Sequence, residues 1–418
     1  MQKISTKQIV AYLLCGLGFS FVMSFMYMQY VYYDAMLEVL HVTNAQLGFL
    51  ISVKAIGDLI VAVPGGLVAD RWDSKKVLVV FLAITTLTCG AFAMITTYKF
   101  ALVVWFILAI VMGPWYSAVY KVVRITATPE TIGKAYGFLG IGVACGSIIT
   151  NTMGLALYSH FAEINSETGL KAILITFFVV GVVATIGGWL AVKDLPTYTS
   201  PEEESMKITV ANLLAVLKDP GTWLYILGCF SIYSFQVSLS YFTPYFTAVV
   251  GTTVALSGFI AVFRQYGLRI ISSPIGGMLG DKLDSTGKVI RGSMCILFAI
   301  VVLVMVLPQG TSFGVLFAIV MVLGLLGTMN ISLQASISKD CMVPPKHMGI
   351  VTGATALISA DLFQATMFGN WLDTYGNAGY TRIWMYTLLD LAFCITILTI
   401  AIRRRKRLEA KAAEETTE

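Results

Sequence analysis

Two charged residues, Lys54 and Asp58, lie four positions apart inside the apolar segment 51–76. Residues four apart share one face of an α-helix, so the two side chains can form an ion pair. A charge at the centre of a membrane helix costs roughly 2.5–3.5 kcal/mol, and such charges often mark a binding site or proton pathway. Two interpretations stay open: a site for a ligand or proton, and a structural ion pair.

A second basic residue, Arg264, lies 210 positions after Lys54 (264 − 54) in another apolar segment. Two cations at matching depths, one from each half of the chain, would bind an anion in a central cavity. Arg269 follows five residues later, about 140° around the helix from Arg264, and lies on a different face. The deep basic residues therefore favour an anionic ligand.

One further acidic residue, Asp361, lies in the middle of an apolar segment, so two deep carboxylates accompany three deep basic residues. Structural ion pairs across the helices explain these charges equally well. The chain has three histidines, and all of them fall in predicted loops. A coupled proton would therefore be carried by Asp58 or Asp361.

The elements that must position these charges are apolar helices. Of the 418 residues, 57% are hydrophobic and 12% are charged, about half the charge density of a typical soluble protein. The apolar runs are about 20 residues long, which is the length that crosses a bilayer as a helix. We predict an all-α polytopic membrane protein with twelve spans at 8–33, 46–69, 77–97, 100–123, 133–158, 170–192, 222–247, 254–279, 289–308, 312–337, 348–371 and 380–402.

Lysine and arginine concentrate in the loops on one side of these spans, which places both termini in the cytoplasm. The predicted parts are a six-helix bundle at 1–192, a cytoplasmic linker with a short amphipathic helix at 193–219, a second six-helix bundle at 220–402, and a basic cytoplasmic tail at 403–418.

The two bundles repeat each other. Gly48, Gly57 and Pro64 of the second span match Gly258, Gly267 and Pro274 of the eighth at a constant offset of 210 (258 − 48). A six-span repeat in one orientation indicates two pseudo-symmetric bundles related by an axis along the membrane normal.

The loop after the second span resembles the signature of the major facilitator superfamily, G-x-x-x-D-(R/K)-x-G-R-(R/K). Gly66, Asp70, Arg71 and Lys75 match this pattern, whereas Asp73 and Ser74 depart from it. Asp281 and Lys282 occupy the corresponding place in the second half. The resemblance implies that these six matching residues form a conformational latch at the inner ends of the bundles.

In this superfamily the first, fourth, seventh and tenth spans line a central cavity. The resemblance therefore implies that polar and aromatic residues of those spans contact the substrate together with Lys54, Arg264 and Arg269: Tyr27, Tyr30, Tyr116, Tyr120, Gln236, Tyr241, Asn330 and Gln334. The fourth span lacks the mid-helix arginine of proton-coupled drug exporters, and the chain is loosely similar to bacterial organic-anion transporters.

The resemblance and the deep cations together predict a secondary active transporter of a small organic anion, such as a carboxylate, sugar acid or phosphate ester, moved with protons. The alternatives are transport of a neutral polar or amphipathic solute, or drug export, with the buried charges acting as latches. No catalytic triad, metal-ligand spacing or nucleotide motif is present in the sequence. We expect no enzyme activity, no cofactor or metal and no nucleic-acid partner, and a monomer in a prokaryotic inner membrane.

Overall fold

The computed structural model describes residues 4–128, 130–198, 210–308, 311–344 and 347–415, with the side chains of 62–71, 210–213, 412, 413 and 415 excepted. These ranges are almost entirely helical and contain no strand. Within these ranges, eleven segments are long and apolar enough to cross a membrane, and the last of them, Met348–Lys411, has 64 residues. Because one crossing needs about 20 residues, this last segment holds two spans. The protein is an all-α polytopic membrane protein with twelve spans, as the sequence predicts.

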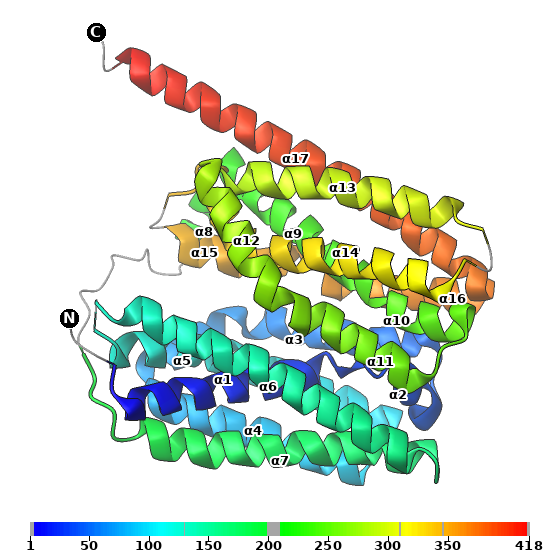
Figure 1. The fold of residues 1–418 in the computed structure, drawn as a ribbon. Coiled ribbons are helices and arrows are strands. Elements are labelled where there is room, and N and C mark those ends of the chain that lie inside the picture. The colour runs from blue at the N-terminus through cyan, green and yellow to red at the C-terminus, as the bar shows by residue number, and fades with distance from the viewer. Residues whose placement is uncertain (1–3, 129, 199–209, 309–310, 345–346, 416–418) are drawn as a thin grey trace. The chain divides into compact units, whose positions relative to one another are not determined.

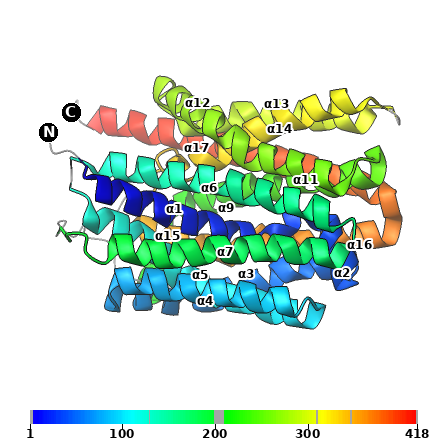
Figure 2. The ribbon, with the colours of Figure 1, turned by 60° about the horizontal axis from the view of Figure 1, so that its bottom comes forward.

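One compact unit, here called unit 1, comprises residues 1–201 and 246–267. Figure 1 shows its helix α1 beside α6, and Figure 2 shows α1 between α6 and α7. Helices α3 and α4 each pack against α5. The helices of unit 1 are α1 (Thr6–Met26), α2 (Tyr33–Leu40), α3 (Asn44–Arg71), α4 (Ser74–Met94), α5 (Tyr98–Thr126), α6 (Ile132–Phe161), α7 (Ser166–Val192) and α11 (Val254–Val262).

The contact between α1 and α6 in unit 1 depends on glycine. A Cβ atom added to Gly16 of α1 would lie 2.7 Å from the Cα atom of Gly142 in α6. No larger residue fits there without separating the two backbones, and small residues at helix crossings permit the closest packing in membranes. These two glycines therefore set the contact between α1 and α6.

The second compact unit, unit 2, comprises residues 202–245 and 268–418. Its central helix α9 packs against α14 and α17, while α13 packs on α17 and α12 on α14. The helices of unit 2 are α8 (Val210–Leu217), α9 (Pro220–Ser240), α10 (Phe242–Tyr245), α12 (Leu268–Lys282), α13 (Thr286–Val306), α14 (Phe313–Leu333), α15 (Met348–Ala354), α16 (Gln364–Tyr375) and α17 (Gly379–Glu415).

Five predicted spans are not continuous α-helices, and one of them is the tenth, in which the 3-10 helix η4 (Gln334–Ser338) follows α14. The first ends as an α-helix at Met26, and π-helical turns interrupt the seventh and eighth at η2 (Phe246–Val250) and η3 (Phe263–Gly267). The eleventh breaks between α15 and α16, where Ser359 is extended. In contrast, α17 continues through the predicted tail, and Figure 1 shows it running past the end of α13.

Candidate functional site

The unit 1 charge cluster consists of Lys54, Asp58 and Tyr27. Lys54 of α3 is 7% exposed, and its Nζ atom lies 2.6 Å from Oδ2 of Asp58. The same Nζ donates a hydrogen bond of 2.8 Å to the hydroxyl of Tyr27, whose ring stacks on Tyr30 with centroids 5.8 Å apart. The structure thus brings together four residues that the sequence singled out, and it provides Lys54 with both an anionic and a neutral partner.

Arg264 has a different environment within the same unit. Its side chain is 2% exposed, and its η1 nitrogen is buried without a hydrogen-bond partner. Among the described residues, no carboxylate lies within ion-pair distance of it, and no ring lies beneath it. It occupies η3, a π-helical turn, and such turns occur frequently at functional sites. A buried guanidinium without a counterion is costly, because burial removes its hydration without compensation.

Three further candidates, Arg269, Tyr116 and Tyr120, have exposed side chains. Arg269, five residues beyond Arg264, lies on the exposed part of α12. Tyr116 and Tyr120 of α5 are 42% and 36% exposed, and their rings pack together with centroids 5.0 Å apart. Their aromatic faces are accessible to a ligand or a lipid.

Two of the candidates in unit 2 connect helices to one another. The hydroxyl of Tyr241 donates a 2.8 Å hydrogen bond to the backbone oxygen of Ala365, joining α9 to α16. Asn330, 1% exposed, accepts a hydrogen bond from Ser293 and so joins α14 to α13. Both side chains therefore have internal packing partners in the structure.

The two amide candidates are Gln236, which lies on α9, and Gln334, which begins a short helix that packs against α9. The Oε1 atom of Gln236 is buried without a hydrogen-bond partner among the described residues. Gln334 opens the short 3-10 helix η4 (Gln334–Ser338) and is partly exposed. Gln236 is thus the amide of this pair that has unused hydrogen-bonding capacity.

Asp361 lies in the break of the eleventh span, within the 3-10 turn η7 (Ala360–Leu362). It is 2% exposed, and its Oδ2 atom accepts a hydrogen bond of 3.2 Å from the hydroxyl of Tyr233. The hydroxyl of Ser359 accepts a hydrogen bond from the Asp361 amide, which starts the turn. Irregular backbone at membrane depth is tolerated where protein or a polar cavity surrounds it.

Asp390 and Gln364 are the residues that sequence reasoning missed. Asp390 of α17 is 6% exposed, lies beside Ser231 and Ser234 of α9, and has an Oδ2 atom without a partner among the described residues. Gln364 begins α16 and is fully buried. The available signal for Asp390 was a carboxylate in the middle of the apolar span 380–402, the same signal that identified Asp361.

Three residues of the predicted latch, Gly66, Asp70 and Arg71, are among those whose side chains the structure does not describe. Lys75 is buried, and its Nζ atom donates a 2.6 Å hydrogen bond to the backbone oxygen of Leu195. Asp281 and Lys282 are exposed. In unit 1, Lys75 thus ties the start of α4 to the end of α7.

An ion-pair network at the end of unit 2 uses residues that the sequence did not indicate as a latch. Arg405 of α17 lies 2.9 Å from Asp340, which is 1% exposed and also accepts from Ser285 and from the backbone nitrogen of Gly287 at the start of α13. Asp284 is paired with Lys339 and Arg405, and the Lys339 ammonium group lowers the pKa of Asp284 below its ordinary value.

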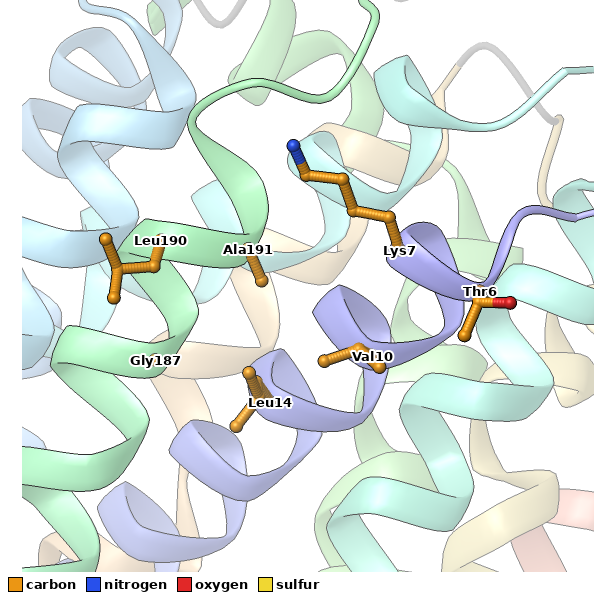
Figure 3. A pocket seen from close by; sticks show the side chains of 7 residues that line it. All are labelled: Thr6, Lys7, Val10, Leu14, Gly187, Leu190 and Ala191. Carbon is orange, nitrogen blue, oxygen red and sulfur yellow. The ribbon is translucent and has the colours of Figure 1, made fainter.

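A cavity of about 400 Å³ lies between the first turns of α1 and the last turns of α7. Figure 3 shows Val10 and Leu14 of α1 facing Leu190 and Ala191 of α7 there, with Lys7 at one end. Its lining is almost wholly apolar and includes no candidate site residue. Among the described residues, no cluster of three or more His, Cys, Asp or Glu side chains is placed to hold a metal.

Comparisons with known proteins bear on this arrangement. The family model described as the Major Facilitator Superfamily matches residues 9–365. Inner membrane protein YqcE of Escherichia coli (strain K12) is 23% identical over 406 residues, which cover 93% of each chain. Inner membrane protein YihN of the same organism is 26% identical over 283 residues, which cover 66% of each chain.

Solved transporter structures share the fold. A bacterial homolog of the human lysosomal transporter Spinster, in an inward-facing and unoccupied conformation, has a TM-score of 0.74 at 15% identity, covering 96% of this chain and 99% of its own. The nucleoside transporter NupG has a TM-score of 0.66 at 13% identity, covering 96% and 99%. With a family match that spans most of its length and a fold shared with these transporters, the chain belongs to the Major Facilitator Superfamily.

Proposed function

We propose that this transporter moves a small organic anion, such as a carboxylate, sugar acid or phosphate ester, by alternating access. The observation that carries the proposal is Arg264, a 2% exposed guanidinium with no carboxylate partner among the described residues. A guanidinium presents several donors in a planar fork that matches a carboxylate or phosphate. A bound anion would supply the counterion that Arg264 lacks.

Lys54 has a different proposed role. Its ion pair with Asp58 is already formed, so it would bind an anion after Asp58 takes up a proton. That exchange would couple proton and anion movement, with Asp361 as the second candidate proton carrier. The tyrosines Tyr27 and Tyr30 lie beside this pair, and Tyr116 and Tyr120 of the same unit have accessible rings with which to contact the rest of a substrate.

Transport of a neutral solute is the alternative, and the Lys54–Asp58 pair supports it. A pair with 2.6 Å between Nζ and Oδ2 needs no ligand to satisfy it, and the fold neighbour NupG is described as a nucleoside transporter. In this case Asp58 and Lys54 would act as a structural latch. Arg264 distinguishes the two proposals, because a neutral solute leaves its charge uncompensated.

The test is ligand-induced stabilisation of the purified protein with panels of anionic and neutral metabolites. A ligand that binds the folded state raises its stability by RT ln(1 + [L]/Kd), about 2.7 kcal/mol at one hundred times Kd. We expect anions to stabilise the native protein fully and the Arg264→Lys variant partly. They should not stabilise the Arg264→Gln variant. Arg269→Gln, which removes an exposed arginine from the same span, is the matched control and should behave as the native protein does. Neutral ligands that stabilise Arg264→Gln fully would overturn the proposal.

We further propose a monomer in the inner membrane with both termini in the cytoplasm. The relatives YqcE and YihN are inner membrane proteins, and the basic residues follow the positive-inside rule for this orientation. Labelling of single cysteines placed in the loops, with an impermeant thiol reagent on intact cells, tests the orientation. Reaction of residues beyond α17 from outside the cell would contradict it.

A further inference from the structure

We propose that unit 2 contains a binding site for Na⁺, formed by the carboxylate of Asp390, the side-chain oxygen of Gln364 and the serine hydroxyls of α9. This proposal deepens the proposed transport function by naming a coupling cation. The binding itself does not depend on an anionic substrate, so it can be tested alone.

The site is assembled on one face of α9. Ser231, Ser234 and Ser238 follow one another at spacings of three and four residues, which places them on the same side of the helix. All three are fully buried. Helix α17 packs against α9 and brings Asp390 beside Ser231 and Ser234, while the broken eleventh span brings Gln364 to the same face.

The orientation of Gln364 is fixed by its donors. Its Nε2 atom donates to the backbone oxygen of Ser234 at 2.9 Å and to the hydroxyl of Ser238 at 3.0 Å. Both amide protons are therefore used, and the other end of the amide must be the carbonyl oxygen. That Oε1 atom is buried and receives no hydrogen bond from the described residues.

Asp390 presents a second unused acceptor. Its side chain is 6% exposed, and Oδ2 is buried without a hydrogen-bond partner. No basic side chain among the described residues lies within ion-pair distance of it. Buried polar atoms are nearly always satisfied, and an unpaired carboxylate in an apolar interior is especially costly.

The available ligands suit a small hard cation. Carboxylate, amide and hydroxyl oxygens are the donors that hard cations prefer, and no sulfur or imidazole ligand accompanies them. One carboxylate balances one positive charge, so a monovalent ion leaves the site neutral. A water molecule could donate to both free acceptors, but it would leave the charge of Asp390 uncompensated.

The interruption of the eleventh span packs against α9. Between α15 and α16 the chain passes through two short 3-10 turns and the extended residue Ser359. Such interruptions free backbone carbonyls from helical hydrogen bonds, and unwound helices in membrane transporters coordinate Na⁺ in this way. Asp361 lies in the same interruption, three residues from Gln364.

The experiment measures thermal unfolding of the purified full-length protein in NaCl, KCl and choline chloride at equal ionic strength and without organic anion. We expect the unfolding temperature to rise with NaCl and to saturate, as binding to the folded state requires. Asp390→Asn should abolish this rise. Asp373→Asn makes the same chemical change at an exposed position of α16 and should retain it. Ser234→Ala removes one ligand and should weaken the affinity for Na⁺ about tenfold, which corresponds to roughly 1.4 kcal/mol.

Direct binding of radioactive Na⁺ to the native protein, with K⁺ as competitor, keeps the test valid if Asp390→Asn does not fold. Equal unfolding temperatures in the three salts together with no bound Na⁺ would overturn the proposal. So would a Na⁺ effect that persists in Asp390→Asn, or stabilisation by protons alone that requires Asp390. None of these results affects anion binding at Arg264, which is measured separately in choline chloride.

Discussion

The two units of the protein bury charges of opposite sign. In unit 1 the buried charges are basic: Lys54, which is paired with Asp58, Lys75 at the start of α4, and Arg264, which has no carboxylate partner among the described residues. In unit 2 the deep charges are the carboxylates Asp361 and Asp390, which face hydroxyl groups. The repeat in the sequence predicts one deep cation per half, whereas compact packing places both cations in unit 1. The difference suggests a division of labour in which unit 1 binds the anion and unit 2 binds the accompanying cation.

The largest effect is expected from separating the pair in unit 1. Lys54→Met removes the ammonium group that pairs with the Asp58 carboxylate, and breaking a buried pair typically costs 3–5 kcal/mol. Since the side chain of Asp58 is 27% exposed, we expect about 3 kcal/mol, measured by denaturant unfolding.

The double variant Lys54→Met with Asp58→Leu should recover most of that loss, because no uncompensated charge remains. This cycle reports the coupling energy of the pair. A double variant that is as unstable as the single one would show that Lys54 contributes through other contacts, and the contrast between a paired and an unpaired cation in unit 1 would fail.

The two unpaired charges should respond in the opposite direction. Replacing Arg264 with Met, or Asp390 with Leu, removes a buried charge that the described residues do not neutralise. We expect the ligand-free protein in choline chloride to gain about 2 kcal/mol in either case, while its anion or Na⁺ response is lost. A loss of stability in Arg264→Met would show that the guanidinium is already compensated.

A smaller effect is expected at the hydrogen bond that holds the broken span in unit 2. Tyr241→Phe removes the 2.8 Å bond to the backbone oxygen of Ala365, and such a hydrogen bond contributes about 1 kcal/mol to stability. Hydrogen exchange at the start of α16 should become faster. Unchanged exchange would show that the break is held by packing alone.

The smallest effect concerns Asp284, whose pKa is lowered by Lys339. A lowered pKa stabilises the fold above the ordinary aspartate range, and this contribution is lost as the pH falls through the folded pKa. The unfolding temperatures of the native protein and Asp284→Asn should therefore differ at neutral pH and converge under acid conditions. High salt should reduce the difference, because Asp284 is exposed. A difference that grows in acid would contradict this origin.

The fold was largely predictable because span length and charge distribution follow directly from the bilayer. The ion pair of Lys54 and Asp58 was also predictable, because residues four apart lie on the same face of a helix. The break in the eleventh span was not, since one extended residue hardly changes the apolarity of a segment. Ser359 followed by Asp361 is a helix-start signal inside an apolar run, and it was the available indication.

The site was less predictable than the fold. Tyr241 and Asn330 are residue types that often line a polar cavity, but in the structure they form hydrogen bonds between neighbouring helices. Which polar side chain finds an internal partner depends on helix rotation and tertiary packing, and a single sequence does not specify these. The paired state of Lys54 was predictable, but the isolation of Arg264 required the structure.

The interruption in the eleventh span also affects how the protein is synthesised. Helix α16 has 12 residues, or about 18 Å at 1.5 Å per residue, which is too short to cross a bilayer core of about 30 Å. The segment also carries Asp361, which opposes its partition into lipid as it leaves the ribosome. Its stable insertion depends on packing against α9 and α17, and α17 follows α16 in the chain. The eleventh span can therefore be held in place only after α17 has been synthesised.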